Sequence, residues 1–306
     1  MEIRHLHHFV ALAQEGSFTR AARKVNIVQS GLSNSIKELE QELGSVLVER
    51  TTRKVALTET GVLFLQHARV TLASLQGAVQ AVRSQDGVVH GQLRLGIMQS
   101  LGSYLELIPL LKQFRSAFPT VDVSVRALIA DAVPGLVRSG EIDLSFHAIV
   151  GRDRWPGIQL IPYVHDPLVA ICPRDHLLAS RSLVSLETLS KEIFVDLTPD
   201  RALRRLVDKV FAQHRKKRTT AFEVSDIQPA MQFVANGLGV AIVPSAVAKS
   251  FTESEGGVAL RIGGRADGLP AWRIAIFRRK QKRLIGTDTV DLFLNMLANQ
   301  SRRLDV

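Results

Sequence analysis

Residues 18 to 54 hold the pattern that most restricts how this chain can fold: two short amphipathic helices around a tight turn. Apolar side chains at positions 18, 21, 22 and 25 lie on one side of a first helix. After the turn at 26–28, apolar side chains recur at positions 32, 36, 39 and 43, along one side of a second helix. This order of elements predicts a helix-turn-helix.

The second helix carries a polar face opposite its apolar stripe. That face consists of small or flexible hydrogen-bonding side chains: Gln29, Ser30, Ser33, Asn34 and Lys37. A helix with one buried stripe and such a face is typical of a helix that lies in the major groove of DNA. Ser17, the expected N-cap of the first helix, is placed with these DNA-binding residues.

A basic hairpin is predicted after the second helix. Two short apolar segments, 46–48 and 55–57, look like strands around a polar connection. Arg50, Arg53 and Lys54 lie in that connection, where they can reach phosphates or a minor groove.

The net charge of +10 does not by itself support nucleic-acid binding. Residues 1–90 carry ten Lys and Arg against eight Asp and Glu, whereas residues 91–306 carry 29 against 21. Much of the surplus lies in two clusters, 201–218 and 273–283, which we expect to be solvated surface. The prediction of DNA binding therefore rests on the helix and its polar face.

A cytoplasmic protein is expected from the composition and the N-terminus. The single cysteine, Cys172, allows no disulfide within the chain. Neither a signal-peptide core at the N-terminus nor a run of 18 apolar residues is present, so we expect no membrane association.

A long helix is predicted over residues 59–86, with Thr58 as its cap. Its apolar residues alternate three and four positions apart, which is the spacing of a coiled-coil seam. The seam consists of Leu65, Ala68, Leu72, Leu75, Val79 and Val82. It predicts self-association; the alternative is packing against the chain's own domain.

Beyond a hinge at 84–91 the chain alternates strand-like and helix-like segments. Strands are expected at 93–98, 121–129 and 142–149, with helices at 104–118 and 130–139. This order indicates parallel strands joined by crossover helices. A second set contains strands at 168–172, 221–224 and 240–243 and helices after Pro199 and from about residue 228. A strand at 272–277 and a helix at 287–298 close the chain.

Together these segments resemble the LysR-type transcriptional regulators over essentially the whole chain. The N-terminal resemblance rests on Glu15-Gly16-Ser17-Phe18, Ala21-Ala22, Gln29-Ser30, Leu43-Gly44, Glu49-Arg50 and Leu57-Thr58-Glu59. The distal resemblance rests on Gly140-Glu141-Ile142-Asp143-Leu144, His176-Leu177-Leu178-Ala179 and the segment from Gly237 to Pro244.

The resemblance implies an α+β multi-domain protein: an N-terminal winged helix-turn-helix, a long linker helix, and a two-lobed α/β effector domain similar to type 2 periplasmic binding proteins. We expect a DNA-binding domain at 1–58, a linker and hinge at 59–90, and an effector-binding domain at 91–306. Within the latter, lobe I comprises 91–161 and 267–306, and lobe II comprises 162–266. The resemblance also implies homodimers that pair into homotetramers, with promoter DNA, a small-molecule effector and RNA polymerase as further partners.

Three positions depart from the family pattern. Val28 stands where the family has Ser or Thr, so its side chain cannot cap the second helix. Gly31 replaces the usual Ala, at a cost of about 1 kcal/mol in helix propensity. Asn34 replaces a frequent Arg but can still bond adenine. These departures leave DNA binding in place and the base preference open.

The resemblance places an effector pocket between the two lobes. Ser100 to Ser103 follow a strand and open a helix, and Thr198-Pro199 has the sequence of a helix start, so both can hold an anion through free amides. The expected effector-binding residues are Ser100, Leu101, Gly102, Ser103, Ile129, Phe146, His147, Thr198, Pro199 and Asp226. Apolar side chains with helix N-termini favour a small organic acid, such as an aromatic acid.

No enzymatic motif, cofactor or metal site is predicted. His5, His7 and His8 lack Cys or acidic partners at ligand spacing, and no nucleophile, phosphate-loop or dinucleotide pattern occurs. Two alternatives stay open: a small-molecule-binding protein whose N-terminal unit only dimerises, and an enzyme on a two-lobed α/β fold. A regulator that needs no ligand is a variant of the favoured class.

Overall fold

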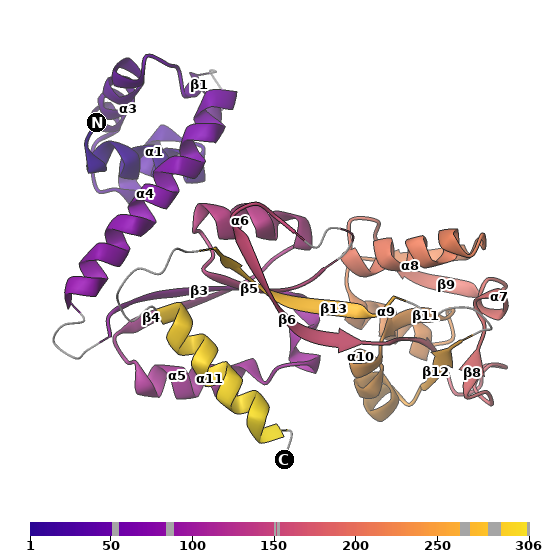
Figure 1. The fold of residues 1–306 in the computed structure, drawn as a ribbon. Helices are drawn as coiled ribbons and strands as arrows, with labels where there is room; N and C mark the ends of the chain where they lie inside the picture. Colours follow the sequence, from indigo (N-terminus) through magenta and orange to yellow (C-terminus); the bar gives the residue numbers. More distant parts are fainter. Residues whose placement is uncertain are drawn as a thin grey trace.

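The structure is a computed structural model that describes residues 1–50, 55–83, 89–149, 151, 154–263, 270–280 and 289–304. Figure 1 shows a small helical domain at the N-terminus, a long helix leading out of it, and two α/β lobes side by side. No helix within the described ranges is long and apolar enough to cross a membrane.

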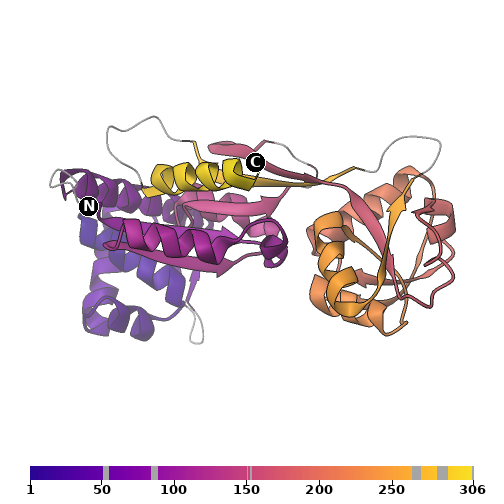
Figure 2. The same cartoon turned by 90° about the horizontal axis from the view of Figure 1, so that it is seen from below.

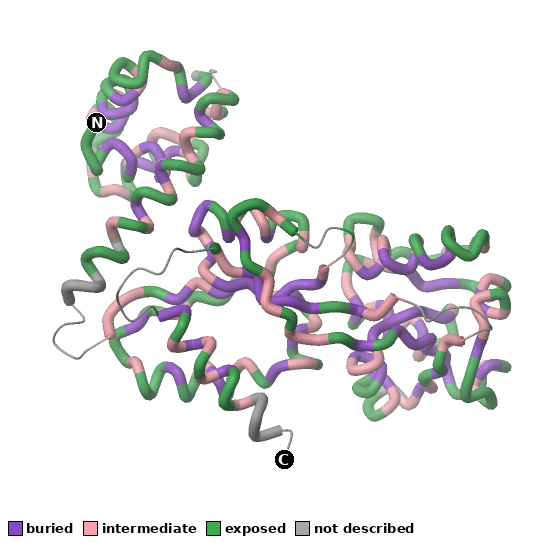
Figure 3. Tube along the Cα trace, in the orientation of Figure 1, coloured by how far each residue is buried: buried purple, intermediate pink, exposed green. Residues whose placement is uncertain are grey.

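Three helices form the N-terminal domain: α1 (Ile3–Glu15), α2 (Phe18–Lys24) and α3 (Gln29–Leu43). Their core combines Phe9 and Leu12 of α1 with Ala21 of α2 and Leu32 and Ile36 of α3, all with no exposed surface. Figure 3 shows this core as buried tube inside the domain. The predicted helix-turn-helix is therefore confirmed.

The hairpin after α3 starts two residues later than the sequence predicts. Strand β1 (Val48–Arg50) pairs antiparallel with β2 (Val55–Leu57). The carboxylate of Glu40 accepts hydrogen bonds from the backbone amides of Leu47 and Val48 at 2.8 and 3.0 Å. The Glu40 side chain thus holds the backbone at residues 47 and 48, where β1 begins.

The long helix α4 (Glu59–Arg83) begins against the base of this hairpin. The Thr58 hydroxyl accepts from the Gly61 amide at 2.9 Å and donates to the Val46 carbonyl at 2.8 Å. Gly61 is required by close packing, because a Cβ atom there would lie 2.1 Å from the Leu47 carbonyl oxygen. The expected cap is confirmed, and it locks α4 to the domain.

Lobe I is built on a five-stranded sheet in the order β4-β3-β5-β13-β6. Strands β3 (Gly91–Ile97), β4 (Val121–Ala127) and β5 (Leu144–Ala148) are parallel, whereas β6 (Ile158–Asp166) and β13 (Trp272–Arg279) run antiparallel to them or to each other. Helices α5 (Leu107–Ala117) and α11 (Thr289–Leu304) lie along one side of the sheet and α6 (Val133–Ser139) on the other (Figures 1 and 2). Two short 3-10 turns, η2 (Gln99–Ser103) and η3 (Ala130–Ala132), follow β3 and β4.

Lobe II holds a four-stranded sheet in the order β11-β7-β12-β8 and the parallel pair β10-β9. Its strands are β7 (Leu168–Cys172), β8 (Leu183–Val184), β9 (Ile193–Leu197), β10 (Thr219–Val224), β11 (Ala241–Pro244) and β12 (Val258–Ile262). Its helices are α7 (Leu186–Leu189), α8 (Ala202–Gln213), α9 (Ile227–Ala235), α10 (Ser245–Ser250) and the single turn η4 (Phe251–Glu255).

The two lobes are connected through the chain segments that follow β6 and precede β13, at the junction seen in Figures 1 and 2. The predicted lobe limit at residue 161 falls inside β6, all of which pairs with β13 up to Asp166 opposite Trp272. The sequence analysis did not predict β6, β8, β9 or β12.

Candidate functional site

The start of α3 presents the polar face predicted from the sequence. Gln29, Ser30, Asn34 and Lys37 are exposed and Ser33 is half-buried, while Leu32 and Ile36 on the opposite face are buried. The structure thus brings the five polar residues together on one surface.

Two contacts orient the residues at this surface. The Thr19 hydroxyl of α2 donates to Oε1 of Gln29 at 3.0 Å, which holds the Gln29 side chain and leaves its amide NH2 group as a donor. The Ser17 hydroxyl accepts from the Arg20 amide, so Ser17 is the N-cap of α2 as expected.

The backbone of Arg50 ends β1, while its side chain, Arg53 and Lys54 lie outside the described residues.

The predicted seam of α4 divides into two parts. Ala68 and Leu72 are buried against Leu6 of α1 in the same chain, and Leu65 packs on the helix-turn-helix core. Leu75 is half-buried, Val79 is exposed, and the Val82 side chain lies outside the described residues. Further apolar side chains of α4 are exposed on other sides of the helix: Val62, Leu63 and Val70.

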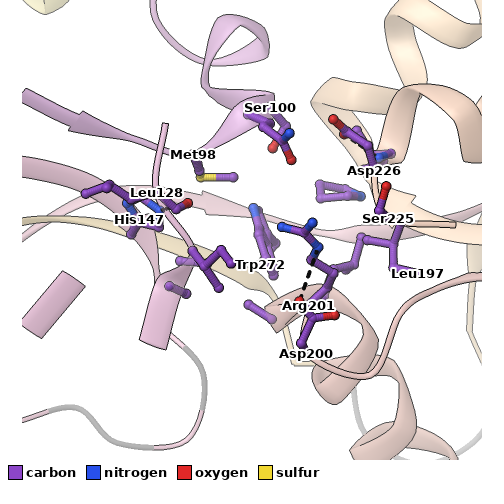
Figure 4. A pocket seen from close by; sticks show the side chains of 18 residues that line it. Met98, Ser100, Leu128, His147, Leu197, Asp200, Arg201, Ser225, Asp226 and Trp272 are labelled. Atoms are coloured by element: carbon purple, nitrogen blue, oxygen red, sulfur yellow. Dashed lines mark hydrogen bonds and ion pairs between the residues drawn. The ribbon is translucent and has the colours of Figure 1, made fainter. Parts of the chain in front are cut away.

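A cavity of about 90 Å³ lies between the lobes, and Figure 4 shows its lining side chains. Four of the predicted effector-binding residues line it: Ser100, Ile129, His147 and Asp226. They come from η2, the segment between β4 and η3, β5 and the start of α9, so elements of both lobes converge on this cavity.

Six predicted residues are not among its lining residues: Leu101, Gly102, Ser103, Phe146, Thr198 and Pro199. The turn η2 is a separate 3-10 turn, and α5 begins only at Leu107, so residues 101–103 open no long helix. Leu101 points into the core, and Phe146 is fully buried with its ring 5.5 Å from that of Tyr163.

The helix predicted to start at Thr198-Pro199 begins later. Helix α8 starts at Ala202 with Arg201 as N-cap, because the Thr198 amide donates to the Val224 carbonyl at 2.9 Å and keeps the chain in a turn. The Thr198 hydroxyl bonds Asp200 and lowers the pKa of that carboxyl group. The predicted helix start at this position is therefore wrong.

Two buried donors in the cavity lining have no hydrogen-bond acceptor within the described part of the chain: Nε of Arg201 and the indole Nε1 of Trp272. Trp272 is 4% exposed. The Arg201 Nε atom forms an ion pair with Asp200 at 3.8 Å, a separation beyond hydrogen-bond distance. Figure 4 shows the Arg201 guanidinium directed toward Trp272 across the cavity.

Arg201 is not among the predicted effector-binding residues, because it lies in the 201–218 cluster that we expect to be solvated surface. Part of that expectation is wrong: the Arg218 side chain is 6% exposed, and its guanidinium donates to Asp196 at 2.8 Å and to Asp208 at 2.6 Å. Arg204 likewise bonds Asp208 and Glu223. The basic cluster runs from the N-cap of α8 to the residue before β10, and its sequence alone does not indicate which of its side chains face carboxylates or a cavity.

Burial favours the neutral form of His147 in this lining. Its Nε2 lies 2.9 Å from the Leu128 carbonyl oxygen and its Nδ1 lies 3.0 Å from the Ser145 hydroxyl. Burial lowers the pKa of His147 below 6.5.

Carboxylates complete the polar lining. Asp226 accepts from the Ile227 amide at 2.6 Å as N-cap of α9, and Asp200 faces the same space. Within the part of the chain that the structure covers, no group of three His, Cys, Asp or Glu side chains could hold a metal ion.

Comparison with known proteins agrees with both parts of this architecture. Residues 3–62 match the model of the bacterial regulatory helix-turn-helix proteins of the lysR family, and residues 86–302 match the LysR substrate binding domain. The chain is 31% identical to the HTH-type transcriptional regulator AlsR of Bacillus subtilis, over 82% of this chain and 83% of that protein. It is 34% identical to the Hca operon transcriptional activator HcaR of Escherichia coli, over 80% and 82%.

Solved structures show the same fold. A full-length OxyR variant of Pseudomonas aeruginosa covers 98% of this chain and 94% of its own, with a TM-score of 0.75 and 24% identity. Full-length CbnR in complex with its target DNA covers 98% and 99%, with a TM-score of 0.62 and 25% identity. The matched families and relatives are regulators rather than enzymes. The chain belongs to the LysR family and is a transcriptional regulator with an N-terminal helix-turn-helix and a C-terminal effector-binding domain.

Proposed function

We propose that this regulator reads its promoter with the exposed face at the start of α3 and holds the DNA backbone with the hairpin that follows. The residues concerned are Ser17, Gln29, Ser30, Ser33, Asn34, Lys37, Arg50, Arg53 and Lys54. The observation that carries this proposal is the common placement of the α3 polar side chains opposite the buried stripe. Asn34 can bond an adenine through both amide atoms, and Gln29 can donate its amide NH2 group to a base.

The dimer that such DNA reading needs is assigned to α4. We expect an inverted repeat with half-sites about one helical turn apart. Ala68 and Leu72 already pack against α1 of the same chain. We therefore propose that the exposed apolar residues of α4 contact a second copy. We further propose that the dimers pair into a tetramer, that the protein contacts RNA polymerase and that it is cytoplasmic. The proposed domain limits are 1–58 for the DNA-binding domain, 59–90 for the linker and hinge, and 91–306 for the effector-binding domain.

The proposed effector is a small organic acid bound between the lobes. The observation that carries it is a pair of buried donors in one cavity, Arg201 Nε and Trp272 Nε1, for which the described residues supply no hydrogen-bond acceptor. A buried donor left unpaired costs about 1–3 kcal/mol, which a ligand carboxylate recovers. Apolar groups of Met98, Leu128 and Leu203 supply a wall for a ring or alkyl part.

DNA reading is tested by selecting bound sequences from a random pool and measuring affinity by gel shift at fixed salt. The double variant Gln29→Ala, Lys37→Ala is expected to bind the selected site at least tenfold more weakly than the wild type. Gln41→Ala, an exposed glutamine in the last turns of α3, serves as the control and is expected to bind normally. Unchanged binding by the double variant would refute the assignment.

Effector class is tested by thermal shift with matched pairs of carboxylic acids and their amides. Acids are expected to raise the melting temperature more than their amides, and Arg201→Gln is expected to remove the difference. Lys209→Gln, which removes an exposed cation from the same helix, is expected to retain it. Stabilisation by neutral or cationic compounds alone would contradict this effector class, and a regulator that responds to no compound would be the ligand-independent variant.

A further inference from the structure

Val28 is among the most exposed large apolar residues in the structure. Its exposed fraction is 70%, and it lies directly before α3, with extended backbone angles of φ −76° and ψ 149°. Its side chain makes no cap hydrogen bond. An isopropyl group at the tip of a helix that is otherwise polar on its exposed face therefore has no role in the domain's core.

The surroundings of Val28 leave its methyl groups uncovered. The next two residues, Gln29 and Ser30, are polar and exposed, and both belong to the proposed DNA-reading face. The closest position on the first turn of α3 is Gly31, where a Cβ atom would lie 3.6 Å from Cγ2 of Val28. Because Gly31 has no side chain, that face of Val28 stays open.

The major-groove edge of a base pair offers one apolar group, the 5-methyl group of thymine. In a helix-turn-helix the N-terminal residues of the second helix meet base edges. Resting on the DNA-reading role proposed above for α3, we propose that Val28 is a specificity-determining residue that contacts a thymine methyl group beside the bases read by Gln29 and Ser30.

The expected effect is small but selective. Burial of one methyl-sized group against another is worth about a fourfold change in affinity. A dimer on two half-sites doubles the free-energy effect, so loss of both methyl groups weakens binding about fifteenfold. Contacts of Val28 with phosphates or with hydrogen-bonding base atoms would show no dependence on that methyl group.

The test replaces thymine by deoxyuridine, one position at a time, in the site selected from the random pool. Deoxyuridine pairs like thymine but lacks the methyl group. Wild-type binding is expected to weaken about fourfold at one position in each half-site. Val28→Ser is expected to bind both DNAs equally, and it should keep its fold because Ser is a preferred N-cap residue. Val46→Ser changes a valine of the same domain that is 63% exposed, and it is expected to keep the wild-type sensitivity.

The inference is overturned when deoxyuridine at every thymine leaves wild-type affinity within twofold. It is also overturned when Val28→Ser remains as sensitive as the wild type. Failure of the wild type to select any sequence would instead refute DNA reading by α3 and this inference together. The two failures are thus distinguishable, since only the first occurs with a protein that binds its selected site.

Discussion

Arg69 of the linker helix and Glu141 of lobe I form an ion pair, with Nη1 and Oε1 2.5 Å apart. Both side chains are at most one-fifth exposed, and burial lowers the pKa of Arg69. The Ser139 hydroxyl also donates to Glu141 at 3.2 Å. Gly140 turns between them with φ +73°, which favours glycine, and packs against Ala73 of α4. The linker helix is therefore fastened to the effector domain of its own chain by a specific, largely buried contact.

Glu141→Gln is expected to loosen this junction. The substitution leaves a mostly buried guanidinium without its counter-charge, which costs about 1–3 kcal/mol. Urea unfolding should show the loss of stability, and small-angle scattering should show a larger radius of gyration. As the control, Glu187→Gln removes an exposed partner of Lys216 and is expected to change stability by less than about 0.5 kcal/mol. Equal effects of the two variants would contradict a fastening role.

Two residues of α4 should separate folding from self-association. Leu72 is buried against α1, so Leu72→Ala is expected to destabilise the protein by about 2–3 kcal/mol. Val70 is exposed, so Val70→Glu is expected to leave the melting temperature nearly unchanged while it weakens the dimer. Sedimentation velocity over a range of concentrations measures the second effect. If Val70→Glu forms a dimer as tight as that of the wild type, Val70 does not contact the second copy, and another face of α4 must do so.

Local sequence patterns predict the helices of this protein but not the contacts between segments far apart in the chain. Periodicity located α3 and α4 because each helix buries one side against neighbours close in the chain. Periodicity could not show whether Ala68 and Leu72 pack against α1 of the same chain or against a second copy, because both arrangements require the same apolar spacing. Local cap signals failed at Thr198, where a strand partner 26 residues away takes the amide. Arg201 and Trp272, whose buried donors line the same cavity, are 71 residues apart in the sequence, and no local pattern predicts that they lie together.

Gly31→Ala is expected to stabilise the N-terminal domain. Glycine inside a helix is about 1 kcal/mol less favourable than alanine. The added Cβ would meet only Cγ2 of Val28 at 3.6 Å, an ordinary van der Waals contact, so no strain offsets the gain. Thermal unfolding of the full chain, followed by helical circular dichroism, is the measurement. A lower melting temperature would show that the first turn of α3 needs the freedom of glycine.

His147 should make stability depend on pH in a defined direction. Burial lowers the pKa of His147 below its ordinary value of 6.5, so below pH 6.5 the unfolded chain binds a proton that the folded chain does not. The contribution of His147 to stability therefore falls as the pH decreases through 6.5, by up to about 1.4 kcal/mol between pH 7.5 and 5.5. His147→Gln, which keeps a donor for the Leu128 carbonyl, lacks this contribution. The pKa of His8 is also lowered, but His8 is present in both proteins, so the difference between their urea midpoints at pH 7.5 and 5.5 isolates His147. If the wild type and the variant lose the same stability on acidification, the imidazole is not held neutral by the fold.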